Sequence, residues 1–268
     1  MKDKVIIITG GSSGIGRACA LAFGKAGGKV VISARNAQKL NEVGQELEAA
    51  DIEFLAVTGD VSKEEDCHRL IEETVARFGG IDVMLNNAGI SMRALFQDVD
   101  LAVIRQLMDI NFWGTVYCTK FALPYIQQRK GSIIGVSSIA GFQGLPGRTG
   151  YSASKFAMQG FLGALRTEVL HQGVHVMVAC PGFTASNIRN TALAANGQQQ
   201  GESPRDEGKM MSAEEVADKI LEGTIKRQRE LIMTGQGKLT VFLSKWLPGL
   251  TDKLVYNHMK KEADSPFK

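Results

Sequence analysis

Short, continuously apolar runs alternate along this chain with longer segments whose apolar residues recur at helical spacing. The first run, residues 5–8, is β-branched throughout, which is typical of a strand buried on both faces of a sheet. A glycine-rich turn and a helix over 17–26 follow it. Further strands are predicted at 29–33, 54–57, 81–85, 131–138, 174–179 and 231–233, and further helices at 37–50, 63–78, 100–128, 151–171 and from about 212. This alternation predicts an α/β fold of the Rossmann type, a doubly wound parallel β-sheet flanked by helices on both faces.

Length and composition narrow the class of protein. A chain of 268 residues can bury a sizeable core, and 44% hydrophobic with 22% charged residues is ordinary for a soluble globular protein. We expect a single domain over 1–268, in which 185–211 form a substrate loop and 238–268 an amphipathic basic tail. The net charge is only +3 and the basic residues are scattered, so nucleic-acid binding is not expected.

The cysteines and histidines predict neither disulfides nor a metal site. The four cysteines form no Cys-x-x-Cys pair, and free thiols suggest a reducing compartment. The first apolar run is too short for a signal peptide or a membrane span, so a cytoplasmic protein is expected. His171 and His175 are four residues apart, but Gly173 is expected to end the helix between them, and no metal is predicted.

The turn after the first strand predicts a dinucleotide site. Glycines between a buried strand and a helix let the backbone approach a pyrophosphate at the helix N-terminus. The spacing differs from the commoner G-x-G-x-x-G, and turns of every kind use glycine, so the position between strand and helix is what supports the prediction. The residues expected to line this part of the site are Gly10, Ser12, Ser13, Gly14, Ile15 and Gly16.

The end of the second strand favours NADP over NAD. Ala34 stands where an NAD enzyme would place an acidic residue for the adenosine ribose, and Arg35 follows it. A guanidinium can bind the 2′-phosphate of NADP with two hydrogen bonds. The alternative is a solvated arginine at a strand end, and Ser13 leaves the glycine loop without a second basic residue.

Polar and small residues follow three more strands, where open α/β sheets bind ligands. Asp60-Val61 closes the third strand, and Asp60 could accept a hydrogen bond from adenine or simply cap a turn with Ser62. Asn86-Asn87-Ala88-Gly89 closes the fourth strand, and an ordinary turn would explain it equally well. Hydroxyls end the fifth strand at Ser138.

Tyr151 and Lys155 lie four residues apart in a predicted helix, which places both side chains on one face. Lowering a tyrosine pKa from about 10 to about 7 takes roughly 4 kcal/mol. One cation at about 4 Å supplies roughly that much at an effective dielectric constant of about 20. The pair predicts proton transfer to a small molecule, although Tyr and Lys at this spacing also occur on ordinary amphipathic surfaces. Asn111 lies in the middle of an apolar helix, where burial of an amide is unfavourable unless the amide has a hydrogen-bond partner.

These pieces together resemble the short-chain dehydrogenase/reductase family. The motifs Thr9-Gly10-x-x-x-Gly14-Ile15-Gly16, Asn86-Asn87-Ala88-Gly89, Asn111, Ser138, Tyr151-x-x-x-Lys155 and Pro181-Gly182 occur in that family's order and approximate spacing, over about residues 4–233. Each motif is weak alone, but the ordered set is specific.

The resemblance implies a role for each residue. Tyr151 would be the general acid or base, Lys155 would lower its pKa and bind the nicotinamide ribose, and Ser138 would hold the substrate oxygen. Asn111 would anchor a water that links Lys155 to solvent. The adenosine and pyrophosphate half of the coenzyme would lie on the glycine loop and on Arg35, Asp60, Val61, Asn87, Ala88 and Gly89. The nicotinamide would lie along Pro181, Gly182 and Thr184.

The function implied is hydride transfer between NADP(H), or less favourably NAD, and a carbonyl or secondary alcohol. Met92, Phe142, Leu145 and Phe183 fall near the crevice and suggest an apolar substrate, unless they only pack the sheet edge. The alternative is a non-catalytic NADP(H)-binding sensor or scaffold. Such a protein would not need Ser138, Tyr151 or Lys155, and the presence of all three favours an enzyme. A homodimer or homotetramer is expected.

The tail repeats apolar residues at helical spacing on both sides of Pro248-Gly249, with lysines around them. It resembles, weakly, the tails of membrane-associated family members that reduce lipids, retinoids and steroids. Residues 238–261 could make peripheral contact with a membrane, cover the substrate crevice or pack on another subunit.

Overall fold

The structure is a computed structural model and describes residues 1–182, 184, 188–201, 210–262 and 265–267. Within these residues, parallel strands form one sheet in the order β3-β2-β1-β4-β5-β6-β7. The strands are β1 (Val5–Thr9), β2 (Lys29–Ala34), β3 (Phe54–Thr58), β4 (Val83–Asn86), β5 (Ser132–Val136), β6 (His175–Cys180) and β7 (Glu230–Ile232). The strand order reverses between β1 and β4, and such a reversal opens a crevice at the carboxyl ends of the two strands.

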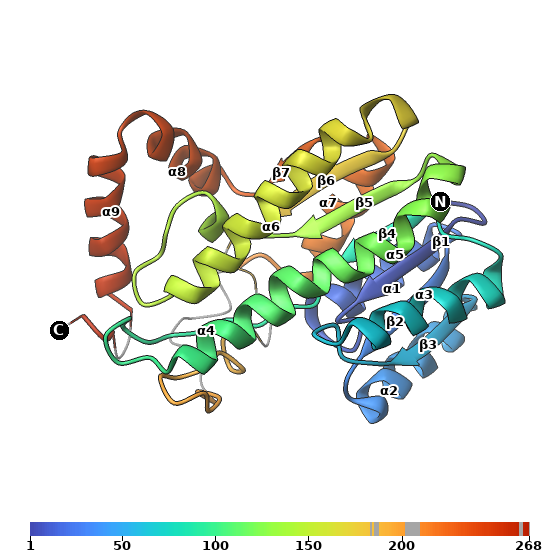
Figure 1. The fold of residues 1–268 in the computed structure, drawn as a ribbon, viewed down its shortest axis with the longest axis horizontal. Helices are drawn as coiled ribbons and strands as arrows, with labels where there is room; N and C mark the ends of the chain where they lie inside the picture. Colours follow the sequence, from blue (N-terminus) through green and yellow to red (C-terminus); the bar gives the residue numbers. More distant parts are fainter. Residues whose placement is uncertain (183, 185–187, 202–209, 263–264, 268) are drawn as a thin grey trace.

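Apolar layers cover both faces of the sheet, because successive strand residues point to opposite sides. Ile6 and Ile8 of β1 pack in one layer, and Val5 and Ile7 pack in the other. The helices of the first layer are α1 (Gly14–Lys25), α2 (Ala37–Ala49) and α7 (Ala213–Ile225), and those of the second are α3 (Glu64–Phe78), α5 (Gly114–Arg129) and α6 (Thr149–Glu168). The predicted doubly wound α/β sheet is confirmed (Figure 1).

The helix predicted over 100–128 is present but changes its pitch in the middle. α4 (Leu101–Leu107) continues through a π-helical segment, η1 (Met108–Trp113), into α5. A π-helical segment accommodates an extra residue and is frequent at functional sites. Here it carries Asn111, whose side chain is fully buried.

The predicted tail forms two helices, α8 (Gly235–Trp246) and α9 (Pro248–Lys260). Pro248 stands in the first turn of α9, where its missing N–H is not needed. Both helices lie at the left end in Figure 1, far from α2 and α3 and beside the loop that leads into α6. In the part of the chain that the structure describes, none of the helices combines the length and apolar character needed to cross a bilayer.

Candidate active site

Hydrogen bonds of Thr9 and Asn87 fix the start of the glycine loop. Thr9 Oγ1 accepts hydrogen bonds from the backbone N–H groups of Asn87 and Ala88, each at 3.1 Å. Asn87 Nδ2 donates in turn to Thr9 O at 2.9 Å and to Gly10 O at 3.3 Å. These bonds join the carboxyl ends of β1 and β4 at the point where the strand order reverses. Asn87 therefore shapes the loop, in addition to any contact it makes with a ligand.

The start of α1 leaves room for a ligand backbone and offers it hydrogen-bond donors. Gly10 and Gly14 have φ angles of +66° and +50°, which favour glycine. A Cβ atom on Gly16 would lie 2.1 Å from Gly10 O. Ser13 caps α1 without a side-chain hydrogen bond, so the first backbone N–H groups of the helix can face an anion. These residues fit the pyrophosphate of a dinucleotide.

The strand-end residues predicted for the adenosine half have different settings. Arg35 follows β2 and is exposed, so a phosphate can reach its guanidinium. Asp60 Oδ1 accepts hydrogen bonds from the backbone N–H and the hydroxyl of Ser62, at 3.0 and 2.8 Å. These bonds agree with the interpretation of Asp60 as a residue that caps a turn with Ser62. A contact between Asp60 and adenine stays a prediction. Val61 is partly buried and lies against Gly114.

A pocket of about 140 Å³ gathers most of the predicted reactive residues. Tyr151 and Lys155 enter it from α6, and Ser138 enters from the end of β5. The predicted coenzyme residues that line the same pocket are Ile15, Asn87, Gly89, Pro181, Gly182 and Thr184. One pocket therefore joins Ile15, from the predicted glycine loop, to the candidate proton donor, while Gly10, Ser12, Ser13, Gly14 and Gly16 are not part of its lining.

Burial and neighbouring groups act in opposite directions on the pKa of Tyr151. Burial raises the pKa of Tyr151, while its hydrogen bond with Ser138 and the charge of Arg148 act in the opposite direction. Lys155 Nζ lies 5.8 Å from the centre of the Tyr151 ring and donates to Val136 O at 2.9 Å. Burial also lowers the pKa of Lys155 to about 8. The charge of Arg148 thus also favours the phenolate, and the lowering of the Tyr151 pKa by Lys155 stays a prediction.

Ser138 is positioned by a residue that the sequence did not single out. Its Oγ accepts a hydrogen bond from Ala140 N at 3.2 Å, at the start of the short helix η2 (Ile139–Gly141). Gln159, one turn after Lys155 on α6, donates to Ser137 Oγ at 2.9 Å and to Ser138 O at 3.4 Å. The helix that carries Tyr151 and Lys155 thus also fixes the end of β5.

Asn111 lies behind the pocket and has several hydrogen bonds. Its Nδ2 donates to Ile90 O at 3.0 Å and to Ser154 Oγ at 2.9 Å, and its Oδ1 accepts from Ile90 N at 2.8 Å. A Cβ atom on Gly89 would lie 3.1 Å from Asn111 Oδ1 and 3.5 Å from Lys155 Nζ. Asn111 is therefore near Lys155 and is a satisfied core amide, and its role in a water relay stays a prediction.

A second cavity, of about 470 Å³, lies between the pocket and the tail. It shares Ser138, Leu145, Pro181 and Gly182 with the catalytic pocket. Its remaining lining is largely apolar and includes Leu239 and Leu243 of α8 and Leu254, Val255 and Met259 of α9. The tail therefore covers the side of the crevice where a substrate would lie.

The four residues expected near an apolar substrate have different places. Leu145 lines both cavities, and Met92 packs in a cluster with Tyr151. Phe142 packs against the core of the second layer, in agreement with the alternative that it only packs the sheet edge. Phe183 lies outside the described residues, as do 185–187 and 202–209 of the predicted substrate loop.

Two arginines at the pocket were not predicted. Arg148, three residues before Tyr151, and Arg189 both line it and are nearly fully buried. Arg189 Nη2 donates to Thr184 O at 2.7 Å, and Thr184 Oγ1 donates to Gly182 O at 3.2 Å. The position of Arg148 one turn before Tyr151 was the available signal.

Across the described residues, no three His, Cys, Asp or Glu side chains gather as metal ligands would.

Known proteins resemble this chain over almost its whole length. The family model described as short chain dehydrogenase matches residues 4–197. Dehydrogenase/reductase SDR family member 7B of Mus musculus is 34% identical over 99% of this chain and 84% of its own length. 11-beta-hydroxysteroid dehydrogenase-like 4A of Arabidopsis thaliana is 38% identical over 97% of this chain and 85% of its own length. A short chain dehydrogenase/reductase from Burkholderia phymatum, solved in complex with NAD, superposes with a TM-score of 0.83 at 23% identity, covering 93% of this chain and 95% of that one.

Proposed function

Since this chain belongs to the short-chain dehydrogenase family, and is thus an NAD(P)-dependent oxidoreductase, we propose that it transfers a hydride between NADP(H) and a carbonyl or secondary alcohol. Tyr151 is the general acid for reduction and the general base for oxidation. The observation that carries the proposal is the pocket in which Tyr151, Ser138 and Lys155 meet Ile15, at the start of α1, and Asn87, at the end of β4. We further propose that residues 1–268 act as one catalytic unit.

The residues of the pocket divide the chemistry between them. The nicotinamide, when bound, supplies or accepts the hydride. In reduction, the Tyr151 hydroxyl donates its proton to the substrate oxygen, and the reverse transfer accompanies oxidation. Ser138 donates a hydrogen bond to the same oxygen and aligns it. Lys155, with a pKa of about 8 caused by burial, supplies a cation or a proton near neutral pH.

The proposal for NADP rests on the exposed guanidinium of Arg35 at the end of β2, with no carboxylate beside it in the sequence. A 2′-phosphate there gains charge-assisted hydrogen bonds that a 2′-hydroxyl does not offer. The relative solved from Burkholderia phymatum binds NAD, so coenzyme preference has to be measured for this chain.

The proposal for an apolar substrate rests on the cavity of about 470 Å³ beside Ser138. Leucines of α8 and α9 line it together with Leu145, which also lines the catalytic pocket. Removal of the apolar part of a substrate from water would favour binding there, while the oxygen of the substrate faced Ser138 and Tyr151.

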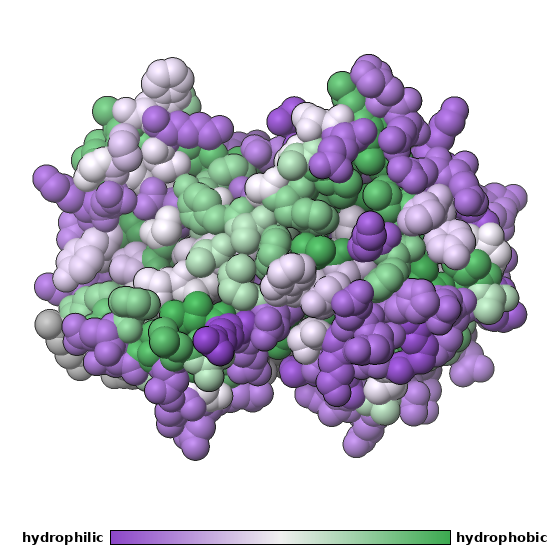
Figure 2. Space-filling model, in the orientation of Figure 1, coloured by the Kyte–Doolittle hydropathy of each residue, from purple (hydrophilic) through white to green (hydrophobic). Residues whose placement is uncertain are grey.

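We also propose a homo-oligomer that uses the face formed by α5 and α6. Figure 2 shows a largely green, apolar band across the middle of the molecule, over these two helices. Trp113, immediately before α5, and Phe156 on α6 remain 43% and 46% exposed. Aromatic residues exposed on a helix pair suit burial against a second copy.

Peripheral membrane contact is proposed for α8 and α9. Leu239, Phe242 and Trp246 of α8 and Leu250 of α9 are about half exposed or more. The five lysines of the segment are all exposed: Lys238, Lys245, Lys253, Lys260 and Lys261. Exposed Trp, Phe and Leu surrounded by lysine suit the surface of an anionic bilayer.

Replacement of the catalytic tyrosine tests the reaction. Tyr151→Phe is expected to fold and bind NADPH normally, because only one hydroxyl is lost. Its turnover of any accepted carbonyl should fall by about 100-fold or more, the usual contribution of a general acid. Nicotinamide absorbance measures turnover, and coenzyme fluorescence measures binding. Near-normal turnover of the variant would refute the acid–base role of Tyr151.

A further inference from the structure

The C-terminal segment places one carboxylate between two arginines. Glu262, just after α9, has a side chain only 4% exposed. Its Oε2 lies 3.3 Å from Arg148 Nη2 and 3.7 Å from Arg93 Nε. Arg148 Nη2 also lies 3.4 Å from Glu262 Oε1, and Arg148 Nη1 lies 3.6 Å from Met259 Sδ. Residues more than a hundred positions apart therefore meet in one buried ion cluster.

Arg148 belongs to this cluster and also to the catalytic pocket. It is the N-cap residue of α6, three positions before Tyr151, and it lines the pocket with Tyr151, Ser138 and Lys155. Its charge favours ionisation of the Tyr151 phenol, against the effect of burial. Among the described residues, further titratable or charged groups around the phenol are Lys155 on α6, Cys180 at the end of β6 and Arg189 in the segment after β6.

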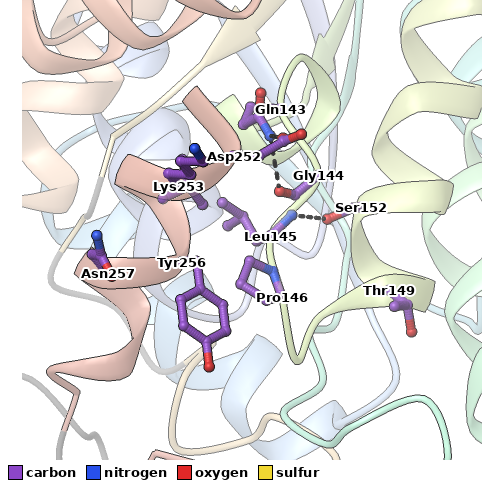
Figure 3. A pocket seen from close by; sticks show the side chains of 11 residues that line it. Gln143, Gly144, Leu145, Pro146, Thr149, Ser152, Asp252, Lys253, Tyr256 and Asn257 are labelled. Atoms are coloured by element: carbon purple, nitrogen blue, oxygen red, sulfur yellow. Dashed lines mark hydrogen bonds between the residues drawn. The ribbon is translucent and has the colours of Figure 1, made fainter. Parts of the chain in front are cut away.

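The tail is fixed to the loop before α6 at further points. Gln143 Nε2 donates to Asp252 Oδ1 of α9 at 3.0 Å, and Figure 3 shows this bond across a cavity between that loop and α9. The cavity measures about 740 Å³ and is lined by residues 143–146 on one side and by Asp252, Lys253, Tyr256 and Asn257 on the other. The Phe267 ring comes within 3.2 Å of where a Cβ atom of Gly147 would stand. Glu262 is thus part of a docked segment.

We propose that Arg148 is a positioning residue for proton transfer by Tyr151, and that Glu262 of the C-terminal segment holds Arg148 in the pocket. The inference rests on the proposed function of Tyr151. It makes the tail a part of the active site, because the charge beside the phenol depends on a carboxylate that the tail supplies.

The role of Glu262 follows from the charges around it. Arg93 and Arg148 approach the same carboxylate in a place with little access to water. Without the negative charge, the two guanidinium groups repel each other and Arg148 loses its buried ion pair with Glu262. On this proposal Arg148 then turns away from the pocket, and the phenol loses the contribution of the Arg148 charge. Neutralising Glu262 is therefore expected to have the same effect on Tyr151 as neutralising Arg148.

Titration of the phenol tests the role of Arg148. The phenolate absorbance of Tyr151 is obtained by subtracting the titration of Tyr151→Phe, since the chain has four tyrosines. Arg148→Gln should raise the pKa of Tyr151 by about half a unit to one unit, the size expected for one charge in a partly buried pocket. Arg148→Lys should keep the parent value, and so should Arg105→Gln, which removes an exposed charge on α4. An unchanged pKa in Arg148→Gln overturns the inference. If that variant does not fold, Arg148→Met is titrated under the same criterion.

Glu262→Gln tests the part played by the tail. It keeps the shape of the side chain and removes its charge, and the pKa of Tyr151 should rise as in Arg148→Gln. A lowered pKa would mean that Glu262 only screens Arg148, and no shift would mean that it only packs; either result overturns the role of Glu262. The alkaline shift should also appear in the pH profile of alcohol oxidation. Because the spectroscopic titration does not depend on turnover, its failure can be told apart from failure of the proposed reaction.

Discussion

Single side chains shape the two halves of the candidate site in different ways. Thr9 and Asn87 join the ends of β1 and β4 through four hydrogen bonds and so fix the glycine loop before any ligand arrives. Arg35, in contrast, is exposed at a strand end and is free to adapt to what it binds. Loop geometry is therefore built into the fold, whereas the proposed preference for NADP depends on the side chain of Arg35.

That dependence gives a prediction for coenzyme choice. Arg35→Ala should weaken NADPH binding by about 10- to 100-fold, because hydrogen bonds to charged groups contribute roughly 1.5–3 kcal/mol. NADH binding should change little. Fluorescence titration with both coenzymes measures the effect, and Lys39→Ala, which removes an exposed cation from α2, is the control. Equal losses for NADPH and NADH would contradict the 2′-phosphate assignment.

The sequence predicted the residues whose chemistry depends on local spacing, but not those that depend on the docked tail. Tyr151 and Lys155 are one helical turn apart, so their shared face followed from the sequence. Arg148 gains its setting from Glu262, which is 114 residues away, and no local pattern predicts such a pair. The effect of Lys155 on the Tyr151 pKa stays a prediction, and the structure adds to it a charge effect of Arg148 that the sequence did not indicate.

At the scale of helices and strands, local pattern was sufficient for most of the fold. Buried strands appeared as apolar runs, and Ser212 with Glu215 forms a capping box where the helix after the substrate loop was expected to begin. The π-helical turn at η1 was missed because the helical spacing of apolar residues continues through it. The tail was predicted as amphipathic, but only the structure placed α8 and α9 against the crevice.

The exposed face of α8 carries the prediction for the membrane. The full chain should sediment with anionic vesicles. The double variant Phe242→Glu, Trp246→Glu should not, because two carboxylates replace apolar side chains and are repelled by the anionic lipid. Leu170→Glu is the control, since Leu170 is 62% exposed but lies beyond the end of α6. Sedimentation that does not respond to the α8 substitutions would rule out this face as the docking site.

At the scale of the whole molecule, the face over α5 and α6 and the tail helices α8 and α9 are different surfaces that meet near the start of α6 (Figure 1). The first is proposed to meet a second copy of the chain and the second a membrane surface. The two proposed contacts use different helices.

Sedimentation velocity tests the subunit contact. The parent chain should be a dimer or tetramer at micromolar concentration, and Phe156→Glu should shift it to monomer, because a charge would be buried in an apolar contact. Leu101→Glu, at a position of α4 that is more exposed than Phe156, should leave the assembly unchanged. A monomeric parent chain, or a Phe156→Glu variant that assembles normally, would contradict this contact.

The most direct test of the central claim is the pH dependence of kcat/KM for oxidation of a secondary alcohol, in the parent chain and in Tyr151→Phe. Oxidation requires the phenolate as base, so the rate should fall about tenfold per pH unit below the pKa of the Tyr151–Lys155 pair and level off above it. Because burial raises the pKa of Tyr151, this limb should lie on the alkaline side. Tyr151→Phe should lose both the limb and the activity. A parent chain that oxidises the alcohol equally well at every pH, or a Tyr151→Phe variant that keeps the profile, would contradict proton transfer by Tyr151.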